Sequence, residues 1–145
     1  MTSRRFATFQ VAERLYGVDV GAVQEILRPQ TCTPIPLADP AIAGILALRG
    51  ELVTAVDLRR RIDAADHGRT DQSMNVVLQY DDELVSLVVD TIGDVVTVEV
   101  EQLTALSDTS ELASPAGAGR RLVTGAYQVE GRLLHVLDLE AVLDI

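Results

Sequence analysis

Side chains that could carry out chemistry are few and widely separated in this chain of 145 residues. His67 lies in a polar stretch and His135 in an alternating apolar one, so we expect a loop residue and a strand residue rather than a catalytic base. Cys32 is the single cysteine, which excludes an intramolecular disulfide and favours a small buried side chain. No zinc-protease, phosphate-loop or serine-hydrolase pattern occurs. The sequence therefore argues against an enzyme.

Two further segments were considered as ligand sites. Asp81, Asp82 and Glu83 are adjacent carboxylates, but they lie between two expected strands and lack the ligand spacing of a calcium loop, which favours a solvated turn. Residues 114–119 are rich in glycine, but no strand precedes them and no lysine follows, so we interpret them as a loop. We predict neither a metal ion nor a cofactor.

Composition restricts the function classes further. The net charge is −10, and the 12 basic residues are all arginine. An acidic surface repels phosphate backbones, and three Tyr, two Phe and no Trp offer few platforms for stacking bases. No apolar run approaches the roughly 20 residues of a membrane span, and the N-terminus lacks the apolar core of a secretory signal. We therefore predict a cytoplasmic protein that binds no nucleic acid and does not insert into membranes.

Short extended segments dominate the pattern and predict a mainly β fold of the barrel or sandwich type. Asp19 is a candidate helix cap, because apolar positions follow it at helical spacing. Pro40 favours a second short helix, and the polar stretch 59–72 predicts a loop that can begin with one helical turn. The expected strands are 6–11, 15–18, 44–48, 51–58, 74–80, 84–89, 95–100, 122–129 and 132–137; the expected helices are 20–27, 41–43 and 139–143, with a second loop at 107–119.

The chain also repeats itself. Residues 15–27 match residues 84–96 in pattern at an offset of 69. Residues 44–62 match residues 125–143 at an offset of 81, with five identical positions, among them Asp57 and Asp138. Two such matches in the same order predict two similar β subdomains related by a pseudo-two-fold axis.

The expected hairpin turns in the two copies of the longer repeat, 44–62 and 125–143, carry their charges in reversed order. Arg49-Gly50-Glu51 in the first copy is matched by Glu130-Gly131-Arg132 in the second. Two solvated turns with incidental charge would look like this, and so would repeated surfaces that bind different partners or assemble head to tail.

Four stretches in order carry a resemblance to a known family. LYGVDVGAVQEIL looks like its first strand and helix, and the Pro-rich run from 33 onward leads to the LRG turn and the DLR motif. LVSLVVDTIGDVV and TGAYQVEGRLLHVLDLEAVL follow. The chain resembles the CheW family, the adaptor proteins of bacterial chemosensory arrays, with departures at Ala47, Ala55 and Ser86. The resemblance implies one domain over 1–145, built of two five-stranded OB/SH3-like β-barrels with exchanged strands, an internal pseudo-two-fold repeat and few short helices.

Members of this family are non-enzymatic scaffolds that couple chemoreceptors to the histidine kinase CheA. The resemblance implies two partners: the regulatory domain of a CheA-type kinase, and the cytoplasmic hairpin tip of a chemoreceptor, to whose membrane-associated arrays the protein would be recruited. Arg49 and Gly50 match the LRG turn, which suggests a kinase or array contact. The implied receptor groove consists of Val23, Glu25, Ile26, Ile92 and Val95.

Alternatives remain open from the residues alone. The apolar groove positions could equally be core, because apolar spacing does not separate the two. Arg49 could be solvated, or could pair internally with a carboxylate such as Glu51 or Asp57. A related adaptor of a pilus-motility or other non-chemotactic pathway would have the same pattern. An OB-fold nucleic-acid binder and a small hydrolase are the remote alternatives.

Overall fold

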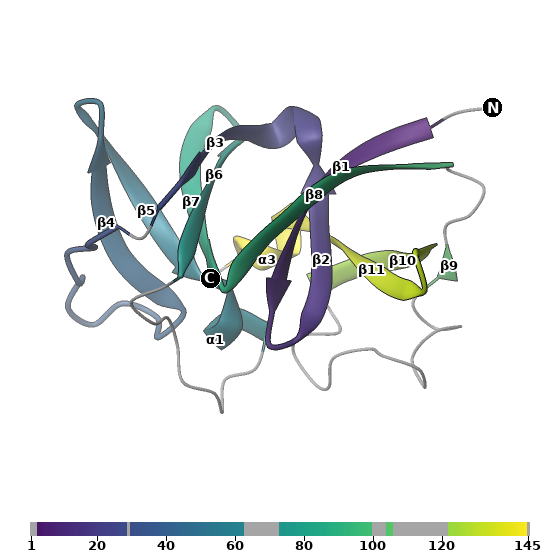
Figure 1. Cartoon of the computed structure of the whole chain (residues 1–145). Coiled ribbons are helices and arrows are strands. Elements are labelled where there is room, and N and C mark those ends of the chain that lie inside the picture. The colour runs from purple at the N-terminus through teal and green to yellow at the C-terminus, as the bar shows by residue number, and fades with distance from the viewer. Residues whose placement is uncertain (1–2, 29, 63–72, 100–103, 106–121, 145) are drawn as a thin grey trace.

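The described residues form two β-sheets and three short helical segments (Figure 1). The computed structural model describes residues 3–28, 30–62, 73–99, 104–105 and 122–144. The mainly β class with few short helices is confirmed. The strands are β1 Ser3–Val11, β2 Arg14–Asp19, β3 Val23–Leu27, β4 Ile42–Leu48, β5 Glu51–Asp57, β6 Met74–Tyr80, β7 Glu83–Val89, β8 Thr91–Glu99, β9 Thr104–Ala105, β10 Val123–Val129 and β11 Arg132–Leu137; the helical segments are η1 Val20–Ala22, α1 Leu58–Ile62 and α3 Leu139–Val142.

The two sheets have matching strand orders. One runs β3-β6-β7-β5-β4, and the other runs β8-β1-β2-β11-β10 with the two-residue β9 added at its end. An isolated bridge between Thr33 and Ile45 in the first sheet occupies the place that β9 has in the second. Strand exchange is visible in Figure 1, where the green β8 leaves its predecessor β7 and lies beside the purple β1.

Backbone pairing repeats with the same offsets as the sequence. Residues 76 and 87 pair in one sheet, and residues 7 and 18, each 69 lower, pair in the other. Thr54 pairs with Val85 in a parallel ladder, and their counterparts His135 and Tyr16 do the same. The correspondence extends to β1 and β6, which the sequence comparison did not match. The division of 1–145 into two intertwined barrel subdomains stays a prediction.

A β-bulge accompanies the glycine that both copies share, and at Gly44 the structure explains it. Register shifts occur just before Gly44 in β4 and just before Gly125 in β10. Gly44 has a φ of +147°, and a Cβ there would lie 2.8 Å from the carbonyl carbon of Thr33. Thr33 and Ile45 exchange backbone hydrogen bonds of 2.8 and 2.9 Å. Only glycine lets the Pro-rich segment approach β4 this closely.

The shared aspartates begin the two helices. The side chains of Asp57 and Asp138 accept hydrogen bonds of 3.4 Å from the backbone N–H groups of Arg60 and Ala141, three residues onward. Their own N–H groups donate to the carbonyls of Ala41 and Leu122, again at the offset of 81. A capping carboxylate satisfies an N–H group that the first helical turn leaves unpaired, so a side chain that accepts a hydrogen bond is favoured here in both copies.

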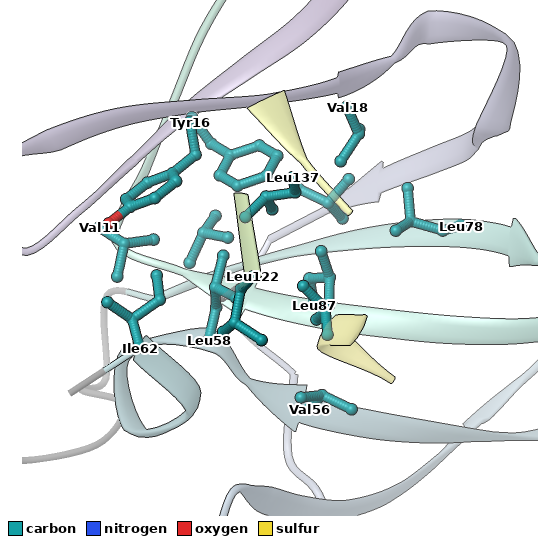
Figure 2. Packing of buried hydrophobic residues seen from close by; sticks show 14 of the residues in the cluster. Val11, Tyr16, Val18, Val56, Leu58, Ile62, Leu78, Leu87, Leu122 and Leu137 are labelled. Atoms are coloured by element: carbon teal, nitrogen blue, oxygen red, sulfur yellow. The ribbon is translucent and has the colours of Figure 1, made fainter. Parts of the chain in front are cut away.

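Three apolar clusters form the core. One lies within the five-stranded sheet around Val53 and Leu46, and another within the larger sheet around Phe6 and Leu134. The largest joins the two sheets, with side chains from both pointing toward one another in Figure 2. Its labelled members are Val11, Tyr16, Val18, Val56, Leu58, Ile62, Leu78, Leu87, Leu122 and Leu137.

Several local predictions were wrong. Asp19 does cap a turn, its carboxylate accepting from Gly21 N–H at 2.9 Å, but only Val20–Ala22 is helical and β3 follows at once. Exposure alternates along β3, because pairing with β6 overrides the helical spacing. Residues 41–43 form no helix, since β4 already begins at Ile42. β8 begins at Thr91 rather than residue 95. His67 and the loop at 107–119 lie outside the described residues.

Candidate partner-binding site

The predicted groove residues lie on equivalent strands of the two sheets. β3 and β8 each end the strand order of their sheet. Val23 pairs with Leu78, and Ile92 pairs with Phe9, at the same relative place. Both Val23 and Ile92 are half-buried and pack against the core cluster that joins the sheets. Val23 and Ile92 are therefore partly core residues.

The outer groove positions are exposed. Ile26 is 44% accessible and Val95 is 48% accessible, and the two are equivalent under the offset of 69. Exposed apolar side chains on edge strands favour aggregation unless a partner covers them. Ile26 and Val95 are thus accessible to a partner, whereas Val23 and Ile92 also pack against the core.

Glu25 and Arg49 form an ion pair of 2.7 Å between β3 and the β4–β5 turn. The partner is thus neither Glu51 nor Asp57, the two neighbours that the sequence suggested. Arg49 is 76% exposed and Glu25 is 24% exposed, so water screens the pair and its stabilising contribution is at most about 1 kcal/mol. The pair matters for geometry, because Glu25, a predicted groove residue, positions the side chain of Arg49, the predicted kinase contact.

The two hairpin tips share one backbone shape. Arg49 and Gly50 have φ of +52° and +84°, while Glu130 and Gly131 have +48° and +80°. Positive φ at both central residues matches the right-handed twist of the flanking strands. Only the first tip is tied down, since Glu130 forms no ion pair within the part of the chain that the structure describes. The tips therefore present the same two charges in reversed order on equal scaffolds.

Asp90, which the sequence analysis did not select, joins three elements beside this surface. Its carboxylate accepts from Arg59 Nε at 3.3 Å and Arg59 Nη2 at 2.6 Å, and from Ala12 N–H at 2.9 Å. Arg59 belongs to α1, Ala12 to the β1–β2 turn, and Asp90 directly precedes β8. The start of the strand that carries Val95 is thereby fixed. The sequence did contain a hint of this pair, because Arg59 ends the DLR motif and Asp90 ends VVD, and both motifs lie in the stretches that carry the resemblance.

The remaining candidates for chemistry have structural roles. His135 is buried, with Nδ1 3.1 Å from the carbonyl of Leu15 and its ring 5.4 Å from that of Tyr16. Burial raises the pKa of Tyr16 to about 12. Asp81 and Asp82 form a turn with positive φ, and Glu83 already belongs to β7. Across the described ranges, no three His, Cys, Asp or Glu side chains are placed to hold a metal ion, and no helix is long and apolar enough to cross a membrane.

Comparisons with known proteins agree on one family. The family model of the CheW-like domain matches residues 5–145. Chemotaxis protein CheW of Bacillus subtilis (strain 168) is 30% identical, over 99% of this chain and 88% of that protein. CheW of Treponema pallidum (strain Nichols) is 29% identical, over 93% and 79%. The crystal structure of scaffolding protein TtCheW from Thermoanaerobacter tengcongensis has the same fold, with a TM-score of 0.84 at 22% identity, covering 99% of this chain and 94% of that one. The chain belongs to the CheW-like domain family.

Proposed function

We propose that this protein is a non-enzymatic adaptor of a chemosensory pathway, which couples chemoreceptors to a CheA-type histidine kinase in the cytoplasm. The observation that carries the proposal is the pair of equivalent exposed residues, Ile26 and Val95, on the strands that end the two sheets. Relatives named as chemotaxis proteins, which match nearly the whole chain, support the pathway. Such an adaptor changes kinase output by binding one state of its partners more tightly than another.

The receptor would bind at Ile26 and Val95. A receptor hairpin tip is helical, and an amphipathic helix lays its apolar face into an apolar groove. Val23 and Ile92 would form the partly buried floor, and Glu25 would stand at the rim, where its charge sets the register of the helix.

The kinase would bind at the tip formed by Arg49 and Gly50. Because Glu25 holds Arg49, both proposed contacts share one ion pair. Receptor binding that moved Glu25 would change the position of Arg49, which gives a physical route from one partner to the other.

Co-elution with a chemoreceptor hairpin fragment and with the CheA regulatory domain from the same genome tests the proposal. Ile26→Asp or Val95→Asp should weaken receptor binding at least tenfold while the protein stays folded, because both side chains are exposed. Leu52→Asp, at an even more exposed leucine on β5, is the matched control. Binding of neither partner by the wild-type protein would refute the adaptor function.

Charge reversal separates the two roles of Arg49. Arg49→Glu should weaken kinase binding, since it places two carboxylates side by side. The double change Glu25→Arg with Arg49→Glu restores the ion pair in reverse. Recovered binding would show that the pair positions the tip, and continued loss would show that Arg49 itself contacts the kinase.

A further inference from the structure

A pocket of about 310 Å³ is lined by none of the residues to which a partner contact is assigned above. Ile42, Val56 and Val85, from three strands of the five-stranded sheet, and Leu143, after α3, supply its apolar lining. Asp81, in the β6–β7 turn, and Glu83, the first residue of β7, also line it. The volume is at the lower end of the range typical of ligand sites.

The internal repeat provides a reference for this pocket. Thr54, Val56 and Val85 line it, and their counterparts in the other copy are His135, Leu137 and Tyr16. All three counterparts are larger and buried, and the rings of Tyr16 and His135 pack 5.4 Å apart. The same backbone site is filled in one copy and hollow in the other.

Among the apolar and aromatic lining residues, two run against this trend but do not close the pocket. Tyr80 and Ile42 are larger than their counterparts Val11 and Val123. Tyr80 also lines a second depression next to α3, so it forms a wall between two hollows. The pocket therefore has apolar strands on one side and an aromatic wall on the other.

The charge beside the pocket is specific to the open copy. Asp81 and Glu83 are exposed, and within the described residues neither has a basic partner. Their counterparts are Ala12 and Arg14, so the filled copy carries no such acidic pair. Burial, followed by the charges of Glu140, Asp81 and Asp138, raises the pKa of Tyr80.

We propose that this pocket receives an arginine or lysine side chain from a partner protein. The aliphatic stem would lie on Val56 and Val85, and the cationic head would stay at the mouth beside Asp81 and Glu83. Arg and Lys bury their stems and keep their charge hydrated, which suits an apolar interior with an exposed acidic mouth. The Tyr80 ring adds a face that attracts cations. The proposal does not depend on the receptor or kinase contacts.

Amide chemical shifts of the full-length protein during titration with N-acetyl-arginine N-methylamide test it. Saturable shifts are expected for the segment 80–85 and for Leu143. The citrulline analogue, which replaces the guanidinium by a neutral urea, should bind several-fold more weakly. Equal binding of both probes, or no shift at Tyr80 and Val85, overturns the proposal.

Variants locate the site. Asp81→Asn and Glu83→Gln should each weaken the arginine probe between about two- and fivefold, as for exposed ion pairs. Asp82→Asn, at the neighbouring carboxylate that does not line the pocket, is the matched control and should leave binding unchanged. Val85→Tyr installs the residue of the filled copy and should abolish binding. If Val85→Tyr fails to fold, Asp81→Asn and Glu83→Gln still test whether the probe binds in this pocket. An effect of Asp82→Asn equal to that of Glu83→Gln would refute the location.

Discussion

Replacing Asp90 by alanine should destabilise the protein far more than its single carboxylate suggests. The change removes two hydrogen bonds from Arg59 and one from the N–H of Ala12, which link α1, the β1–β2 turn and the start of β8. The side chains of Arg59 and Asp90 are 22% and 27% exposed, so the pair is partly shielded from water. A part-buried N–H would also lose its acceptor.

The magnitude follows from these contacts. Hydrogen bonds to charged groups contribute about 1.5–3 kcal/mol when buried, and partial exposure places this site near the lower value for each partner. We expect a loss of about 2–3 kcal/mol in the free energy of unfolding. At about 3 °C per kcal/mol for a chain of this size, Tm should fall by roughly 6–9 °C. Asp90→Asn keeps an acceptor for Ala12 and should cost about half as much.

Urea unfolding and thermal melts measure both quantities. Asp82→Asn is the control, because an exposed turn residue should change stability by less than about 0.5 kcal/mol. A double-mutant cycle with Arg59→Met should yield a coupling energy of about 1 kcal/mol. A change below 0.5 kcal/mol for Asp90→Ala, or no coupling, would mean that the carboxylate does not join the elements as described.

Three further outcomes are expected. Val23→Asp should lower the free energy of unfolding in urea by several kcal/mol, and Ile26→Asp by less than about 1 kcal/mol, since only Val23 packs against the core. Equal losses would contradict the distinction between a partly buried Val23 and an exposed Ile26. Gly44→Ala should destabilise the protein by more than about 2 kcal/mol and Gly50→Ala by about 1 kcal/mol. Both glycines have a positive φ, but of the two only Gly44 would bring a Cβ against backbone atoms. Thermal melts show which variant loses more stability. Stability should fall as pH rises from about 10 to about 12, because in this range the unfolded chain loses the Tyr16 proton that the folded protein keeps. Tyr16→Phe should make the fall less steep, and thermal melts of the wild-type protein and this variant at these pH values test it.

The hairpins were predictable because local signals and tertiary structure agree there. Alternating apolar residues flank Arg49-Gly50 and Glu130-Gly131, and both turns have the positive φ that glycine supplies at little cost. The segment 20–27 was not predictable in this way. Its helical spacing and its cap at Asp19 were real, but pairing with a distant strand, β6, decided the conformation.

Contacts between distant residues explain most of what the sequence concealed. The equivalence of β1 and β6 was hidden because Phe6 and Gly17 in one copy correspond to Asn75 and Ser86 in the other. A Cβ on Gly17 would lie 3.3 Å from that of Phe6, whereas Asn75 Nδ2 donates to Ser86 Oγ at 2.9 Å. Phe6 packed against Gly17 in one copy is therefore replaced by the buried, hydrogen-bonded pair of Asn75 and Ser86 in the other. The departure at Ser86 is thus matched by its partner and leaves the fold intact.

The repeat also indicates how one small chain could distinguish several partners. Ile26 and Val95 keep the same chemistry in both copies, which suits a partner that contacts the two copies alike. The hairpin tips keep their backbone and exchange the places of their Arg and Glu, which suits partners that bind one copy only. The pocket beside Tyr80 is open in one copy and filled in the other. Because the backbones of the two tips are equivalent, folding alone does not require the exchange of their charges, and at these charged tip residues we expect substitutions to change binding while stability stays the same.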